Sequence, residues 1–284
     1  MDKADLINVP FVNSVLHPSD FSKASENAFA HALAIALIRE TKLVLLNVGK
    51  DAEDWREFPS VRTTLERWGF LEEGSDQAEV YEKLNVKVKK IGLGGNRPVP
   101  AILGYLKDNP TDLIVLATNQ KEGVPRWFQP SKAEKIAKKS NSMTLFIPNT
   151  GSGFVSLADG KFHLRRILVP IAHQPDPLPS VEYAARVARL MIEPVEVILF
   201  HAGDATEIPF VELPDDPICT WRKTHKQGDI VQEIENAIRQ YEVDLIIMTT
   251  AGKEGFLDAL RGSVTQQIIR RAPCPVLAVP EWKY

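Results

Sequence analysis

Cysteine, long apolar runs and an excess of positive charge are all scarce in this sequence, and each shortage excludes a class of protein. The two cysteines, Cys219 and Cys274, form no CxxC pair, which fits a reducing compartment. The longest apolar stretch, residues 30–38, includes His31 and is too short to span a bilayer. Residues 1–5 show no basic region leading into an apolar run, so we expect no export signal. These shortages predict a cytoplasmic protein without a membrane partner.

The charge balance argues against nucleic-acid binding. The net charge is −3 at pH 7, and no basic stripe is present that would neutralise a phosphodiester backbone. With 284 residues, 44% of them hydrophobic, the chain is long enough for two compact domains, each with its own core. We therefore expect a two-domain globular protein with no nucleic-acid partner.

The common catalytic and cofactor motifs are missing as well. No GxxxxGK[ST] phosphate loop, GxSxG nucleophile elbow or HExxH zinc helix occurs in the chain. Gly92 and Gly94 do not begin a GxGxxG fingerprint, because Arg97 stands at the third glycine position. We assign no catalytic residue.

An internal repeat is the strongest positive signal in the sequence. Residues 112–118, DLIVLAT, reappear as residues 244–250, DLIIMTT, at an offset of 132 positions. The offset holds without a gap as far as Ile147-Pro148 against Val279-Pro280. A repeat of this length indicates two copies of one domain.

Both copies alternate short β-rich runs with helical patterns. Continuous apolar runs at residues 42–48 and 195–200 are typical of strands buried on both faces, which requires helices on both sides of the sheet. The alternation predicts an α/β fold of two tandem, doubly wound, Rossmann-like domains, each with a parallel sheet of about five strands. We expect the domains over residues 1–150 and 163–284, with a glycine-containing linker at 149–162. In the first copy the expected strands are 12–17, 42–48, 86–91, 112–118 and 144–147, and in the second copy 166–171, 195–200, 220–225, 244–250 and 276–279.

The copies differ most between their second and third strands. Residues 51–83 of the first copy form a longer and more aromatic insertion than residues 203–218 of the second. We expect a helical segment that folds over the carboxyl edge of the first sheet and fills the crevice there. The alternative is a mobile flap or an exposed surface for a partner. The large aromatic residues of the insertion are Trp55, Phe58, Trp68, Phe70 and Tyr81.

A glycine-rich loop follows the repeated strand of the second copy. It begins after Thr250, at the carboxyl edge where open α/β sheets bind their ligands. Gly252 and Gly255 allow the backbone to approach a ligand closely, and Gly262-Ser263 opens a helix whose free N–H groups favour an anion such as phosphate. In the simpler interpretation the glycines shape a turn and the serine is an N-cap. At the matching positions the first copy has Gln120, Gly123, Pro130 and Ser131.

Together with the element order, these motifs resemble the universal stress protein family. In the second copy the resemblance lies in residues 167–170 (ILVP), 244–248 (DLIIM), the glycine loop and residues 272–279 (APCPVLAV). The first copy contributes residues 15–22 (VLHPSDFS) and the strand from Asp112. The resemblance covers nearly the whole chain and implies an adenine nucleotide alpha hydrolase-like fold in each copy. It also implies an ATP site made by an acidic residue after the first strand and a G-2x-G-9x-G-[ST] loop.

The second copy departs from this ATP site in two places. Ala172 stands where the acidic residue belongs, and the spacer before Gly262 has six residues, 256–261, instead of nine. The phosphate half of the site remains, so we expect ATP, AMP or a related phosphate ligand to bind here. The predicted ligand-binding residues are Gly252, Lys253, Gly255, Gly262, Ser263 and Val264.

The first copy has the opposite defect. Asp20 is present, but only Gly123 and Ser131 remain of the loop, and Pro130 removes one N–H donor from the helix entrance. We expect a degenerate site, formed by Asp20, Gly123 and Ser131, that does not bind nucleotide.

Three histidines of the second copy form a competing candidate. His173 follows the first strand, His201 follows the second and His225 ends the third. Three imidazoles can bind a transition metal or a phosphate. No HxH or HxxxH spacing fixes them, and the resemblance implies a histidine at the position of His201 without a metal. We expect no metal site.

These observations predict a stress-response protein that binds an adenine nucleotide weakly in its second domain and acts through an unidentified protein partner. No general base for ATP hydrolysis is identifiable, so we expect at most weak hydrolysis. The alternative is a scaffold of the same fold that has lost nucleotide binding and contacts its partner through residues 51–83. We also expect the two copies to pack as an intramolecular pseudo-dimer through their closing strands, because apolar edge strands are usually covered.

Overall fold

The computed structural model describes residues 12–22, 25–50, 54–56, 58–118, 132–140, 142–149, 153–214, 219–250 and 264–281. The chain divides into two compact units, and the boundary lies between His163 and Leu164. We refer to Val12–His163 as the first unit and to the part from Leu164 onward as the second unit. None of the helices in the described ranges has both the length and the apolar character needed to cross a membrane.

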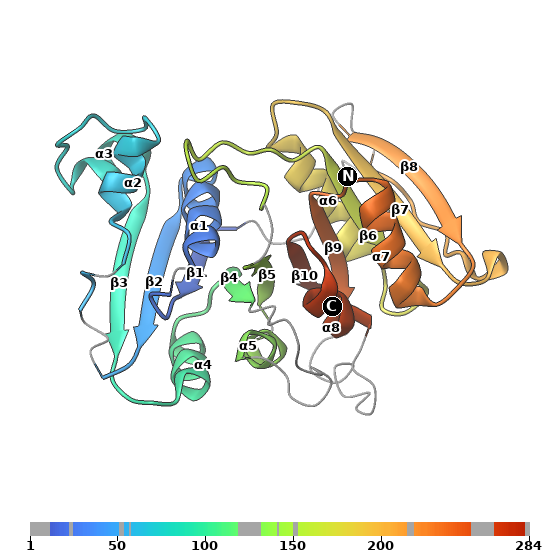
Figure 1. Ribbon diagram of the computed structural model, residues 1–284, viewed down its shortest axis with the longest axis horizontal. Helices are drawn as coiled ribbons and strands as arrows, with labels where there is room; N and C mark the ends of the chain where they lie inside the picture. Colours follow the sequence, from blue (N-terminus) through green and yellow to red (C-terminus); the bar gives the residue numbers. More distant parts are fainter. Residues whose placement is uncertain are drawn as a thin grey trace, which may run out of the picture. The chain divides into compact units, whose positions relative to one another are not determined.

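The first unit is a five-stranded parallel sheet flanked by helices (Figure 1). Its strand order is β3-β2-β1-β4-β5, with β1 at the centre. Helix α1 packs on β1 and β4, while α4 and α5 pack against each other and on β2, β4 and β5. In chain order the elements are β1 (Ser14–Pro18), α1 (Glu26–Ile38), β2 (Lys42–Val48), α2 (Val61–Arg67), α3 (Glu79–Leu84), β3 (Lys87–Leu93), α4 (Pro98–Asp108), β4 (Leu113–Thr118), α5 (Lys132–Ser140) and β5 (Met143–Pro148).

The second unit repeats this arrangement with strand order β8-β7-β6-β9-β10, again all parallel. Helix α6 packs on β6 and β9, and α7 packs on β7 and against α8. The elements are β6 (Arg166–Pro170), α6 (Leu178–Arg189), β7 (Val195–Ala202), η3 (Ala205–Glu207), β8 (Cys219–Lys226), α7 (Ile230–Gln240), β9 (Leu245–Thr250), α8 (Val264–Arg271) and β10 (Val276–Pro280).

The repeat predicted from the sequence has the same register in both sheets. Val15 pairs with Leu113 between β1 and β4, and Ile167 pairs with Leu245 between β6 and β9. Strands β4 and β9 are apolar along their length because they are covered on both faces, as a parallel sheet with helices on each side requires. The predicted fold of two tandem, doubly wound α/β domains is confirmed. The pairing of the two copies through β5 and β10 stays a prediction.

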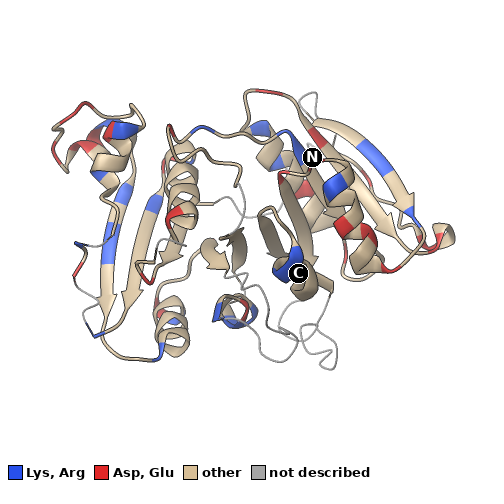
Figure 2. Cartoon of the chain, viewed as in Figure 1, with Lys and Arg blue, Asp and Glu red and all other residues tan. Residues whose placement is uncertain are grey.

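One end strand of each strand order, β3 in the first unit and β8 in the second, carries most of the Lys and Arg residues of its sheet (Figure 2). An outer strand has unpaired N–H and C=O groups, and charged side chains there oppose pairing with another chain. The cations on these strands are Lys87, Lys89 and Lys90 in β3, and Arg222, Lys223 and Lys226 in β8.

The predicted linker is largely a structural part of the first unit. Residues 153–163, here called the closing loop, fold back on themselves through an antiparallel bridge between Val155 and Phe162. Val155 N donates to His31 Nε2 on α1 at 3.2 Å, and Trp68 Nε1 donates to Leu157 O at 3.0 Å. The closing loop therefore ties α1 to the insertion.

Two glycines of the closing loop allow this close contact. A Cβ on Gly153 would lie 2.0 Å from His31 Cε1, and one on Gly160 would lie 2.4 Å from a ring carbon of Trp68. Gly160 also has a φ of +69°, which side chains rarely adopt. These positions require glycine for packing, in addition to any role in a turn.

Candidate functional site

The glycine loop predicted to bind phosphate lies at the carboxyl edge of the second unit. It connects β9, which ends at Thr250, to α8, which begins at Val264. The strand end is fixed by backbone pairing, because Glu281 N donates to Thr250 O at 2.8 Å. Of the predicted ligand-binding residues only Val264 is described, half-buried at the start of α8. Gly252, Lys253, Gly255, Gly262 and Ser263 lie outside the described residues.

The turn after β6 is open to solvent at the place where the family would have its acidic residue. Ile171 stays buried and donates its N–H to Phe200 O at 2.9 Å. Ala172 and His173, which follow it, are exposed. A ligand at this edge would meet backbone groups and a methyl group here instead of a carboxylate.

Two of the three candidate histidines lie together. The rings of His201 and His225 stack with centroids 6.1 Å apart. The ring nitrogens of His201 lie 3.1 Å from the carbonyl oxygens of Ile171 and Asp204, and His225 Nε2 lies 3.2 Å from Gly203 O. Nitrogens that face backbone carbonyls have no lone pair directed at a common metal ion.

The third candidate, His173, takes no part in this ring contact. Its side chain is exposed on the turn after β6, whereas His201 is buried at the end of β7. Among the described residues there is no group of three or more His, Cys, Asp or Glu side chains arranged to hold a metal ion. The histidine pair instead fixes the turn at Gly203 between β7 and η3.

Asp20 of the first unit is exposed, and its carboxylate contacts its own turn. Asp20 Oδ1 accepts from Ser22 N at 3.1 Å. Beneath it, Ser19 is buried and its carbonyl accepts from Asn47 Nδ2 at 2.8 Å. The other residues of the degenerate site, Gly123 and Ser131, lie outside the described residues.

Aromatic side chains cover the carboxyl end of β1. Phe58 is 5% exposed and makes an edge-to-face contact with Phe29 of α1, with centroids 4.8 Å apart. Phe21, in the turn after β1, lies 5.6 Å from Phe58 and 5.1 Å from Trp55. The start of the insertion therefore packs on the turn that follows β1, as predicted.

The helices of the insertion lie elsewhere, and here the prediction of a single segment over the carboxyl edge is wrong. Helices α2 and α3 lie beside the start of β3 in Figure 1, at its amino end. Trp68 is buried against the closing loop, whereas Phe70 remains 44% exposed. Helix α3 packs on β3.

Two buried histidines in the first unit were not identified by sequence analysis. Burial lowers the pKa of both His17 and His31 to about 4, so both are neutral at pH 7. His17 Nδ1 lies 3.0 Å from Val115 O, and His31 Nδ1 lies 2.8 Å from Asn27 O. A neutral His31 that donates from Nδ1 to Asn27 can accept from Val155 at Nε2, as the closing loop requires.

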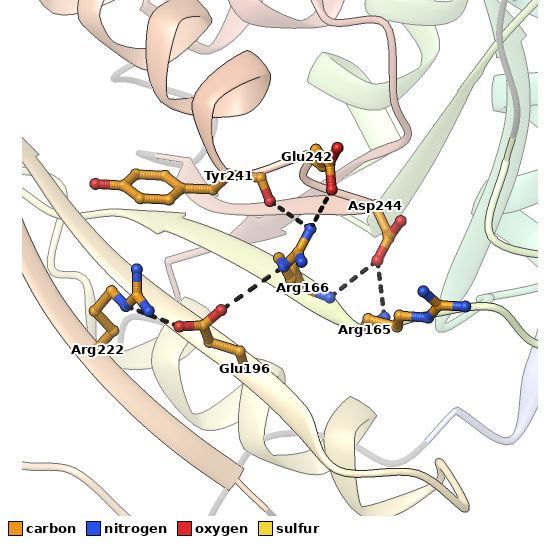
Figure 3. Close-up of polar contacts among 7 residues, drawn as sticks. All are labelled: Arg165, Arg166, Glu196, Arg222, Tyr241, Glu242 and Asp244. Carbon is orange, nitrogen blue, oxygen red and sulfur yellow. Dashed lines mark hydrogen bonds and ion pairs between the residues drawn. The ribbon is translucent and has the colours of Figure 1, made fainter.

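The aspartate shared by the two copies has a structural role at the opposite, amino edge (Figure 3). Asp244 Oδ2 accepts from the N–H groups of Arg165 and Arg166 at 2.8 and 2.9 Å. In the first unit Asp112 Oδ2 accepts from Asn13 N at 2.9 Å and from the Ser14 hydroxyl at 3.0 Å. Each aspartate therefore fixes the start of the central strand of its own sheet.

The amino edge of the second unit adds ion pairs to this arrangement. Arg166 Nη1 donates to Glu242 Oε2 at 2.9 Å and to Tyr241 O at 3.1 Å. Glu196 pairs with Arg222 at 2.8 Å. The charges at this edge contact one another, so we assign them to folding and place the candidate ligand site at the carboxyl edge.

The fold and the position of the glycine loop define a tandem pair of doubly wound α/β domains, with the candidate anion site after the fourth strand of the second. The chain belongs to the universal stress protein family, whose sequence profile matches residues 12–148 and 211–280.

Individual relatives are similar over shorter stretches. A universal stress protein of Methanocaldococcus jannaschii is 40% identical over 57 residues, which cover 20% of this chain and 34% of the relative. A universal stress protein of Methanothermobacter thermautotrophicus is 33% identical over 63 residues, covering 22% of this chain and 42% of the relative. The chain thus spans less than half the length of these curated relatives.

A similar solved structure covers both units. The crystal structure of a universal stress protein from Archaeoglobus fulgidus matches 95% of this chain and 98% of its own length, with a TM-score of 0.60 and 16% identity. At this identity the likeness shows the fold alone.

Proposed function

We propose that the second unit binds an adenine nucleotide, ATP or AMP, or a related phosphate ligand, and that the protein acts in a stress response through a protein partner. The observation that carries this proposal is the difference between the two carboxyl edges. In the first unit Trp55 and Phe58 pack on the turn after β1, whereas Ala172 and His173 of the second unit are exposed. In the part of the chain that the structure describes, the turn after β6 thus makes no contact with an aromatic ring like those made by the turn after β1.

The glycine loop supplies the chemistry that the proposal needs. Its sequence places Gly262-Ser263 directly before α8, so the first N–H groups of this helix have no partner within the helix. Such N–H groups and the helix dipole favour a phosphate. Lys253 adds a positive charge to the same loop.

Calorimetric titration of the full chain with ATP and with AMP tests the proposal. Gly262→Pro removes one N–H donor and crowds the anion, so we expect it to weaken binding at least about tenfold, which is about 1.4 kcal/mol. Ser263→Ala removes the hydroxyl from the same helix start. Its matched control is Ser131→Ala at the corresponding position of the first copy, which should leave binding unchanged.

The outcomes separate the candidate functions. Absence of binding by the unmodified protein at millimolar ATP and AMP contradicts the nucleotide proposal. Equal binding by the unmodified protein and Gly262→Pro places the ligand elsewhere, with His201 and His225 the next residues to replace.

The second candidate is a scaffold that contacts its partner through the insertion. It is favoured by the exposure of Phe70 and Tyr81, at 44% and 48%, in a segment whose other large aromatic residues are more buried. Replacing Phe70 and Tyr81 by serine should leave nucleotide binding unchanged, whichever of the two candidate functions is correct. Loss of partner capture together with unchanged ATP binding would support this candidate.

A further inference from the structure

A cleft of about 560 Å³ lies between the insertion and β3 in the first unit. Helices α2 and α3 form one side and the first half of β3 forms the other. Small-molecule sites in proteins commonly have volumes of about 300–1,000 Å³. The second unit has no insertion at this place in its sequence, so the cleft belongs to the first unit alone.

Valines from three elements form the apolar wall of the cleft. Val61 of α2, Val80 of α3 and Val86, directly before β3, are 6%, 5% and 1% exposed. Val88 of β3 adds a half-buried side chain. These side chains offer a ligand a surface with no hydrogen-bonding groups.

The polar lining of the cleft is cationic. Among the described residues that line it are Arg62, Lys87 and Lys90, and no Asp or Glu is among them. Arg62 has an ion pair with Glu66 at 3.5 Å, but the two lysines lie over aromatic rings. Lys87 Nζ is 5.0 Å from the centroid of Tyr81, and Lys90 Nζ is 5.4 Å from that of Trp55.

Lys90 differs from an ordinary lysine of an outer strand. Alternation along β3 places it on the same face as Val86 and Val88, toward the insertion, and places Lys87 and Lys89 on the other face. Surrounding protein atoms desolvate its ammonium group and lower its pKa. Protection of the outer strand against pairing accounts for Lys89, but it does not require a charge on the face that the insertion covers.

We propose that this cleft binds an organic anion with an apolar body, whose charged group contacts Lys90 and whose apolar part contacts Val61, Val80 and Val86. An anion would supply the negative charge that the cleft lacks. The site is independent of nucleotide binding by the second unit.

Three probes of equal chain length test the proposal by calorimetry on the full chain: octanoate, octyl phosphate and uncharged 1-octanol. We expect at least one anion to bind, and 1-octanol to bind at least about tenfold more weakly. Lys90→Met should weaken anion binding at least about tenfold, whereas Lys89→Met, the same change on the other face, should leave it unchanged. The stronger of the two anions indicates whether the ligand is a carboxylate or a phosphate.

Methyl NMR spectra locate the bound probe and do not depend on the stability of a variant. The anion should shift the methyl signals of Val61, Val80 and Val86. Failure of both anions to bind at millimolar concentration, equal effects of Lys89→Met and Lys90→Met, or 1-octanol binding as tightly as the anions would overturn the proposal. Shifts at these valines produced by AMP, but by neither octyl anion, would also overturn it.

Discussion

The two units are alike at the amino edges of their sheets and unlike at the carboxyl edges. Asp112 and Asp244 occupy equivalent positions and fix the start of the central strand in the same way. At the carboxyl edge, Trp55 and Phe58 contact Phe21 of the turn after β1, whereas Ala172 and His173 of the turn after β6 are exposed. Both copies need the contacts of the amino edge for folding, whereas open α/β sheets bind ligands at the carboxyl edge, so divergence between two copies is expected there.

The largest expected effect concerns the aromatic side chains that pack on the turn after β1. Phe58→Ala removes a buried ring that contacts Phe29 and Phe21, and we expect a loss of about 3–5 kcal/mol in the free energy of unfolding of the first unit. Urea denaturation followed by hydrogen exchange of first-unit peptides measures this loss. Phe210→Ala, at a side chain that is 91% exposed in the second unit, is the control and should change stability by less than about 0.5 kcal/mol.

A second test uses acid. The folded pKa of His17 and of His31 is about 4, below the ordinary value of 6.5, so between these pH values the unfolded chain binds protons that the folded chain does not. The first unit therefore keeps its full stability above pH 6.5 and loses about 1.4 kcal/mol per pH unit for each histidine as the pH falls toward 4.

The closing loop provides the readout for this acid test. Protonation of His31 removes the acceptor of the Val155 N–H, so the protection of that amide, measured against its intrinsic exchange rate at the same pH, should fall as the pH approaches 4. His31→Gln keeps an acceptor without a titrating group and should reduce the pH slope by about half, since His17 remains. An unchanged slope in His31→Gln would show that another group controls the acid response.

The third test asks whether the amino edges are equivalent. Asp112→Ala and Asp244→Ala each leave two donors without a charged acceptor, and each should cost its own unit about 1.5–3 kcal/mol. Hydrogen exchange of β1 and β6 peptides reports the two units separately. A loss confined to one unit would contradict the shared role, and Glu207→Ala, at an exposed position, serves as the control.

The smallest effect is expected from the ion pairs that only the second unit has. Glu196 stands beside Arg166 in the sheet, and the corresponding position beside Ser14 is Lys42. Glu196→Gln should cost less than about 1 kcal/mol, because the partner Arg222 is 51% exposed at its side chain. Thermal unfolding at low and high salt checks this, since added salt should remove most of the effect.

The fold was predictable because parallel strands covered on both faces read as continuous apolar runs. Leu113–Thr118 and Leu245–Thr250 are examples, and their identical pairing follows from the repeated sequence. The course of the insertion was not predictable, because tertiary contacts determine the positions of α2 and α3, and such contacts leave no periodic pattern in the sequence.

The candidate site was predictable only in part. The glycine loop was identified from its sequence and its role stays a prediction, whereas the contact between His201 and His225 follows from the register of β7 and β8, which sequence spacing does not determine. The closing loop was interpreted as a linker because glycine usually indicates flexibility. Gly153 and Gly160 are instead required by the rings of His31 and Trp68, which lie far away in the sequence.

The closing loop also bears on how the protein folds during its synthesis. Domains generally fold as units while the chain grows from its N-terminus. The first unit cannot complete its core when β5 emerges, because His31 and Trp68 still await Val155 and Leu157. The last step of its folding therefore coincides with the synthesis of β6, so the nascent second copy begins to emerge as the first becomes complete.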